Sequence, residues 1–213
     1  SSVVTFYVIA NADEALANFE LTVGLSEGEV IRGIRESVQT TGIYSAFPMS
    51  GKFTFSEGLD MDIAKTPIEI KLLRAVARVD LSMEPNVTNF RIATIQAFRV
   101  NSEIQVMPND LPDFRNPVVH APSVPATSTR TIGTSQLTVT NNKSEAQLYV
   151  AESVSPPAES FVSEATCIVV GGYFNNSNSV SYYRIDFNSG SGSQNLGQVL
   201  RNHRYVFRLT SVS

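Results

Sequence analysis

Residues 68–81 read IEIKLLRAVARVDL, and this stretch decides the fold. Its apolar side chains recur every second residue, which is the period of a β-strand with one buried face. They fall into two phases that change between Leu72 and Leu73: first Ile68, Ile70 and Leu72, then Leu73, Ala75, Ala77 and Val79. A bulge, or a strand that passes from one sheet to another, explains the change of phase. A helix over Lys71–Val79 is the alternative interpretation.

The same two-residue period recurs on both sides of this stretch. It is clearest at residues 3–8, 182–187 and 205–210, and turns rich in Gly, Pro, Asn and Ser separate the segments. This pattern is typical of half-buried strands in antiparallel sheets. Helical signal is limited to Glu27–Ser37, where Ser26 and two acids resemble a capped first turn, and to Asp13–Asn18. The sequence therefore predicts an all-β fold with one or two short helices.

A proline-rich segment between Met107 and Arg130 predicts a domain boundary. Proline cannot donate to a strand ladder, and it stiffens an extended path. We place an N-terminal domain at residues 1–116 and a C-terminal domain at residues 117–213. The second is small for a β-sandwich, which takes about 100 residues, so we expect it to lack a strand.

Composition argues against several classes of protein. The chain has 213 residues, of which 42% are hydrophobic and 17% charged, with a formal net charge of −4. This balance gives no basic field for nucleic acid or an anionic membrane, and no apolar run is long enough to span a bilayer. The single cysteine, Cys167, excludes an intramolecular disulfide and a cysteine-rich zinc site. Without a lipobox cysteine or leader near Ser1, the chain is expected to be a mature or trimmed form.

The candidate residues for nucleophilic catalysis do not form a recognisable set. Cys167 lies in an apolar run, where we expect a buried structural thiol. His203 precedes the last strand and is expected to bond to a turn, while His120 lies in the proline-rich segment. The sequence predicts no enzyme, no cofactor and no metal site, with a hydrolase as the least favoured alternative.

Two acidic pairs and one glycine pair have simple structural explanations. Asp60 with Asp62, and Glu27 with Glu29, could serve a glycosidase, but a solvated acidic face is the expected role. Gly171-Gly172 lacks the spacing of a phosphate loop and is expected to form a bulge or a strand end. The seven tyrosines lie mostly on predicted strands, where sheet packing is favoured over a glycan-binding platform.

Six segments together resemble the Bacteroidales fimbrillin family, the subunits of type V pili. The most telling are LRAVARVD at residues 73–80 and LRNHRY at residues 200–205. They occur with Phe6–Ala12, Phe47–Gly51, Tyr149–Glu152 and Tyr183–Phe187 in the order of the family, across nearly the whole chain. The resemblance implies two tandem transthyretin-like β-sandwich domains, an exported lipoprotein precursor, and assembly at the outer surface. It also implies that a protease cutting after Arg removes an N-terminal strand, and that a strand of the next subunit fills the resulting groove.

On this basis we expect a structural subunit of a cell-surface pilus that assembles head-to-tail by strand exchange and supports adhesion. Its partners would be other pilin subunits and a surface receptor. The expected groove residues are Val4, Phe6 and Val8, which lie closest to the trimmed end. The alternative is a glycan-binding β-sandwich module that does not polymerise.

Overall fold

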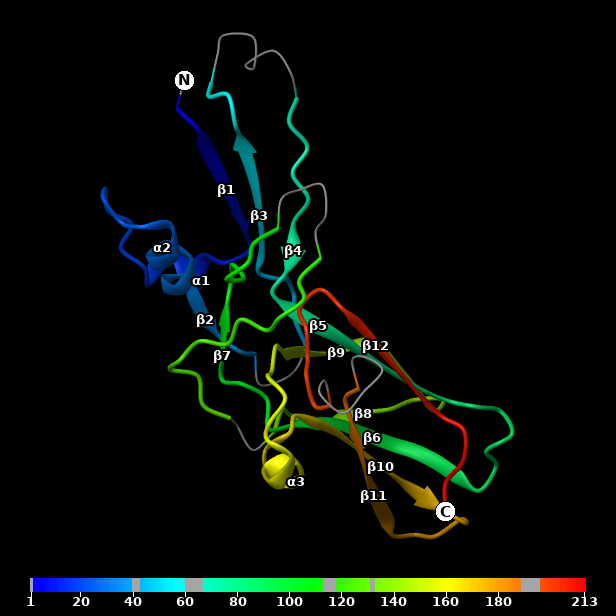
Figure 1. Ribbon diagram of the computed structural model, residues 1–213. Coiled ribbons are helices and arrows are strands. Elements are labelled where there is room, and N and C mark those ends of the chain that lie inside the picture. The colour runs from blue at the N-terminus through cyan, green and yellow to red at the C-terminus, as the bar shows by residue number, and fades with distance from the viewer. Residues whose placement is uncertain (1, 40–42, 60–66, 113–117, 131–132, 189–195) are drawn as a thin grey trace.

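The computed structural model describes residues 2–39, 43–59, 67–112, 118–130, 133–188 and 196–213 (Figure 1). The strands are β1 (Val4–Ala10), β2 (Arg35–Ser37), β3 (Met49–Phe55), β4 (Leu73–Arg74), β5 (Val76–Met83), β6 (Phe90–Phe98), β7 (Glu103–Gln105), β8 (Leu137–Thr138), β9 (Lys143–Ala151), β10 (Cys167–Phe174), β11 (Val180–Asp186) and β12 (Arg204–Leu209). The helices are α1 (Asp13–Ala17), α2 (Glu27–Gly33), the 3₁₀ turn η2 (Ala158–Ser160) and α3 (Phe161–Glu164). None of the helices in these ranges is long and apolar enough to cross a membrane.

The strands form four sheets, in the orders β1-β3-β4, β2-β7, β12-β5-β9 and β11-β10-β6-β8. Every named pair is antiparallel except β5 with β12, which is parallel. The predicted all-β class, with several antiparallel sheets and few short helices, is confirmed. Figure 1 shows β1 and β3 extending away from the other sheets at the N-terminal end, with the C-terminus at the opposite end.

Both predicted helices form. Ser26 caps α2: its Oγ accepts from the Glu29 N–H at 3.3 Å, and its own N–H donates to the Glu29 carboxylate at 2.7 Å. The helix ends at Gly33 and not at Ser37, because Arg35–Ser37 pair with β7 as β2. Helix α3 and the turn before it were not predicted, since four helical residues are too few to show a period.

The stretch at residues 68–81 passes from one sheet to another, as its change of phase predicts. β4 pairs with β3 in the first sheet, whereas β5 pairs with β9 and β12. Ala75 lies between them, fully buried, and its N–H donates to the Pro48 carbonyl at 2.8 Å. The alternative of a helix over Lys71–Val79 is wrong.

The sheets β12-β5-β9 and β11-β10-β6-β8 form a β-sandwich that encloses the main core. Alternate residues of β5, β6, β9 and β10 fill it, together with Phe187 and Val199. A bulge between Gly171 and Gly172 shifts the register of β10 against β6, as predicted. A side chain at Gly172 would collide with the Phe90 ring, so the bulge needs glycine there.

Strands on both sides of the proposed domain boundary share these sheets. β5 and β6 precede residue 116, yet they pair with β9, β10 and β12 beyond it. The division at residues 116 and 117 therefore stays a prediction. A second, smaller core lies under α1 and α2 and includes Ala15, Ile31 and Val106.

A buried ion pair joins four segments of the chain. The side chains of Arg201 and Glu152 are 1% and 2% exposed, with Arg201 Nη2 at 2.7 Å and Nε at 2.9 Å from Glu152 Oε2. The guanidinium also donates to the carbonyls of Val106 at 2.9 Å and Gln105 at 2.8 Å. Backbone N–H groups of Arg201 and Ser123 complete the shell of the carboxylate. The turn before β12, the residue after β9, the end of β7 and the segment at Ser123 are thereby held together.

We expect Arg201→Met to lower the free energy of unfolding by about 3–5 kcal/mol, because it leaves the Glu152 charge buried without a partner. The double variant with Glu152→Met should recover part of this loss. Urea unfolding measures both values, with Arg208→Met as a control on an exposed pair, where a change below about 1 kcal/mol is expected. A loss as small as that control in Arg201→Met would contradict this account.

Glu36 gives stability a pH dependence. It is half-buried on β2, and burial together with the charges of Glu14 and Asp13 raises its pKa to about 7. The folded state therefore holds a proton that the unfolded chain releases near pH 4.5, so stability falls as pH rises from about 4.5 to 7.

We expect Glu36→Gln to add roughly 1 kcal/mol to the free energy of unfolding at pH 8 and nothing at pH 4, after allowing for solvent screening. Thermal melting at pH 4 and pH 8 tests this, with the exposed Glu20→Gln as control. An equal gain in stability of Glu36→Gln at both pH values would contradict the prediction.

Candidate functional site

The predicted groove residues lie on one face of β1. Val4, Phe6 and Val8 are directly opposite Phe55, Phe53 and Gly51 of β3, and residues opposite each other in an antiparallel pair share a face. Together, Val4, Phe6, Val8, Phe53 and Phe55 form what we call the Phe face. The β1 half of this face was predicted from the sequence, and the β3 half was not.

The Phe face is apolar and partly open to water. Phe6 is 44% exposed, and the other four members are half-buried. The ring centroids of Phe6 and Phe55 are 5.7 Å apart and those of Phe53 and Phe55 are 4.7 Å apart, both edge-to-face. The rings therefore form a continuous apolar surface. It lies on β1 and β3, the two strands that extend away from the other sheets in Figure 1.

The other face of β1 is committed to the small core. Tyr7 and Ile9 pack against the residues under α1 and α2. The Tyr7 hydroxyl donates to the Glu27 carboxylate, which also lies 3.6 Å from Lys52 Nζ on β3. Burial and the bond to Glu27 raise the pKa of Tyr7, and the same bond lowers the pKa of Glu27. These contacts fix the orientation of β1, so that the Phe face must point outward.

β1 is also an edge strand. It is first in the order β1-β3-β4, and among the described strands it pairs with β3 alone. The backbone groups on its outer side therefore have no ladder partner within the described part of the chain. Such an edge is a template for another strand. Seven residues, Val4–Ala10, would be long enough to pair with a strand of ordinary length.

Segment 70–72 covers the Phe face at the end where Val8 lies opposite Gly51. A Cβ placed at Gly51 would lie 2.6 Å from the Lys71 carbonyl oxygen and 2.9 Å from Ile70 Cγ2. Segment 70–72 thus passes so close to β3 that only glycine fits at this position. The open part of the surface lies at the Phe6 and Phe55 end.

We expect Gly51→Ala to lower the free energy of unfolding by about 1–3 kcal/mol, because segment 70–72 must move away from β3. Gly28→Ala in α2 is the matched control, since its methyl group meets only the flexible end of Arg32 and alanine favours the helix. Chemical denaturation compares the two. Equal stability of Gly51→Ala and the parent chain would show that segment 70–72 does not constrain the sheet.

The other candidates from the sequence do not come together into one site. Cys167 is 1% exposed, and burial raises the pKa of its thiol. His203 Nδ1 lies 2.8 Å from the Arg201 carbonyl, as expected of a turn residue. His120 is exposed, and Asp60 with Asp62 lies outside the described residues. Glu27 and Glu29 bond to Tyr7 and Ser26, so they do not form a free acidic pair. In the described ranges, no three metal-binding side chains cluster.

Comparison with known proteins shows a similarity of fold. No protein-family model and no curated protein match the sequence. The structure is similar to the solved structure of the tip fimbrial protein Mfa3 from Porphyromonas gingivalis with a C-terminal truncation. The TM-score is 0.59 and the identity 16%, over 98% of this chain and 76% of that chain. The chain therefore shares a fimbrial-protein fold.

Proposed function

We propose that the chain is a structural subunit of a cell-surface fimbrium, and that it accepts a strand from a neighbouring subunit along β1. The observation that carries the proposal is the unpaired edge of β1 beside the exposed Phe face. The shared fold with a fimbrial tip protein supports the general role. The groove residues are those expected from the sequence, Val4, Phe6 and Val8.

Strand addition has a clear physical basis at this edge. An incoming strand would pair with the outer backbone groups of β1, and its alternate side chains would cover the Phe face. Three buried aliphatic side chains contribute roughly 5–9 kcal/mol before the costs of ordering. The backbone hydrogen bonds add a smaller net free energy and fix the register.

Such a contact uses different surfaces on the two subunits. A head-to-tail contact of this kind does not close on itself and so grows a filament. In keeping with the family resemblance, the proposal includes export as a lipoprotein, cleavage after an Arg, and a place at the outer surface, where the fimbrium supports adhesion. It assigns no catalytic role.

Phe6→Arg tests the groove. We expect it to abolish polymers seen on gels without boiling, because a guanidinium on the Phe face would be buried by an incoming strand without a partner. The parent chain and the variant are expressed in cells that assemble the fimbrium.

Val206→Arg is the matched control. Val206 is 51% exposed on β12, close to the 44% of Phe6, but it lies on another sheet, and the polymer ladder should persist. Thermal melting must show that both variants fold. Undiminished ladders in a folded Phe6→Arg variant would remove the Phe face from the assembly contact.

A further inference from the structure

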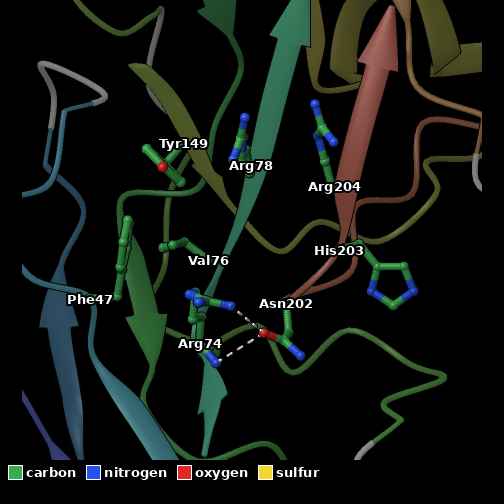
Figure 2. Close-up of a pocket in the computed structure, with 8 residues that line it drawn as sticks. All are labelled: Phe47, Arg74, Val76, Arg78, Tyr149, Asn202, His203 and Arg204. Atoms are coloured by element: carbon green, nitrogen blue, oxygen red, sulfur yellow. Dashed lines mark hydrogen bonds between the residues drawn. The ribbon is translucent and has the colours of Figure 1, made fainter. Parts of the chain in front are cut away.

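A pocket of about 250 Å³ opens where the chain passes from β4 to β5. Figure 2 shows its walls: Phe47 and Tyr149 on one side, with Arg78 beside Tyr149, and Arg204 with His203 on the other side. Arg74 and Asn202 lie at the base. Val76, only 1% exposed, forms part of the lining. The pocket lies beyond the first residue of β3, whereas Phe55 of the Phe face is the last residue of that strand.

Two sequence motifs that the assembly role does not explain meet here. Residues 73–80 supply Arg74 and Arg78, and residues 200–205 supply Asn202 and Arg204. Parallel pairing of β5 with β12 places Arg204 directly beside Arg78, and Tyr149 of β9 is opposite Arg78 on the other side. A row of one aromatic and two guanidinium groups therefore crosses the outer face of the sheet.

Charge in and around the pocket favours an anion. Asp80 accepts from Arg78 Nε at 2.8 Å and from Arg204 Nε at 2.6 Å, and Glu145 accepts from Nη2 of both arginines. These carboxylates orient the two guanidinium groups and leave both Nη1 atoms without an acceptor among the described residues. Arg74 has no carboxylate within ion-pair distance in the same ranges. Three guanidinium groups thus face two carboxylates.

Arg74 is held in place although it is exposed. Asn202, in a left-handed conformation at φ 57°, accepts from Arg74 Nη1 at 3.3 Å through its side-chain oxygen. The Arg74 Cζ lies 5.8 Å from the centre of the Phe47 ring. These two contacts leave guanidinium N–H groups of Arg74 available to a ligand.

One side of the pocket is aromatic. The ring centroids of Phe47 and Tyr149 are 4.6 Å apart, and Tyr44 packs against both. Tyr149 is only 9% exposed, so the half-buried Phe47 is the ring that can cover the apolar face of a sugar. The planar fork of an arginine matches a carboxylate, and the amide nitrogen of Asn202 can bond to a hydroxyl. The volume is below that of pockets for drug-sized ligands, which suits a single ring.

We propose that this pocket binds a carboxylate-bearing sugar, such as a sialic acid or a hexuronic acid at the end of a glycan. Arg74 pairs with the carboxylate, Phe47 covers the ring, and the free Nη1 atoms of Arg78 and Arg204 bond to ring or glycosidic oxygens. The ligand class follows from an excess of positive charge combined with an aromatic wall. The inference goes beyond the proposed assembly role and does not depend on it.

Titration calorimetry on the soluble monomeric chain tests the proposal. The probes are sialyllactose, an oligosaccharide ending in glucuronic acid, and neutral lactose. We expect at least one acidic probe to bind, lactose not to bind, and rising salt to weaken the interaction. Arg74→Gln should lower the affinity roughly tenfold or more. Phe47→Leu should lower it several-fold, since it keeps apolar bulk but loses the ring.

Arg208→Gln is the matched control. Arg208 is an exposed arginine on β12 whose Nε lies 3.2 Å from Glu84, away from the pocket, so affinity should be unchanged. Equal binding of lactose, no binding of either acidic probe, or an unaltered Arg74→Gln variant would overturn the proposal. Arg74-dependent binding of an acidic peptide with no sugar binding would also overturn it, because the ligand would then be a neighbouring protein. Since the monomer is used, these outcomes are independent of whether Phe6→Arg blocks polymers.

Discussion

The buried pair of Arg201 and Glu152 is the constraint on which the arrangement of the sheets depends. Both charges are buried away from water, so each must be satisfied within the protein. A movement that separates them would leave two buried charges without partners, at a large cost in free energy. The guanidinium binds the carbonyls of Gln105 and Val106 as well, which belong to the part of the chain near the small core. The pair therefore fixes the position of the turn before β12 relative to β7. An apolar contact of the same size would permit sliding, whereas these directed bonds do not.

The backbone near Ala75 also fixes how the first sheet and the sandwich are placed relative to each other. One extended segment contributes β4 to the first sheet and β5 to the sandwich, so the two sheets share a strand direction and cannot rotate freely about a loop. The turn at Asn202 bonds to this segment, because its N–H donates to the Val76 carbonyl at 2.9 Å. The arginine pocket is thus built on paired strands and one bonded turn, which keeps its side chains in place before any ligand arrives.

Strands and sheet class could be predicted from the sequence because a periodic pattern carries that information. Alternation gave the strands and the all-β class, and its change of phase indicated the passage between sheets near Ala75. Alternation does not encode the direction of a neighbour, so the parallel pairing of β12 was not predictable. The ion pair was missed because a lone Arg and a lone Glu have no pattern that marks them as buried. Of the Phe face, only the β1 half was named, since its β3 half depends on the pairing register.

The arginine pocket was beyond the reach of the sequence for a related reason. Its side chains come from four separate parts of the chain, and each arginine alone looks like part of a solvated face. The proposed strand addition at β1 would depend chiefly on backbone groups, which any residue supplies, whereas the proposed binding in the pocket would depend on particular side chains at particular positions. The β-sandwich fold can therefore persist at 16% identity, because alternation and volume are enough to maintain it. The proposed recognition has no such tolerance, because it depends on the guanidinium of Arg74 and the ring of Phe47. The proposed assembly surface and the proposed pocket can for this reason change independently on one scaffold.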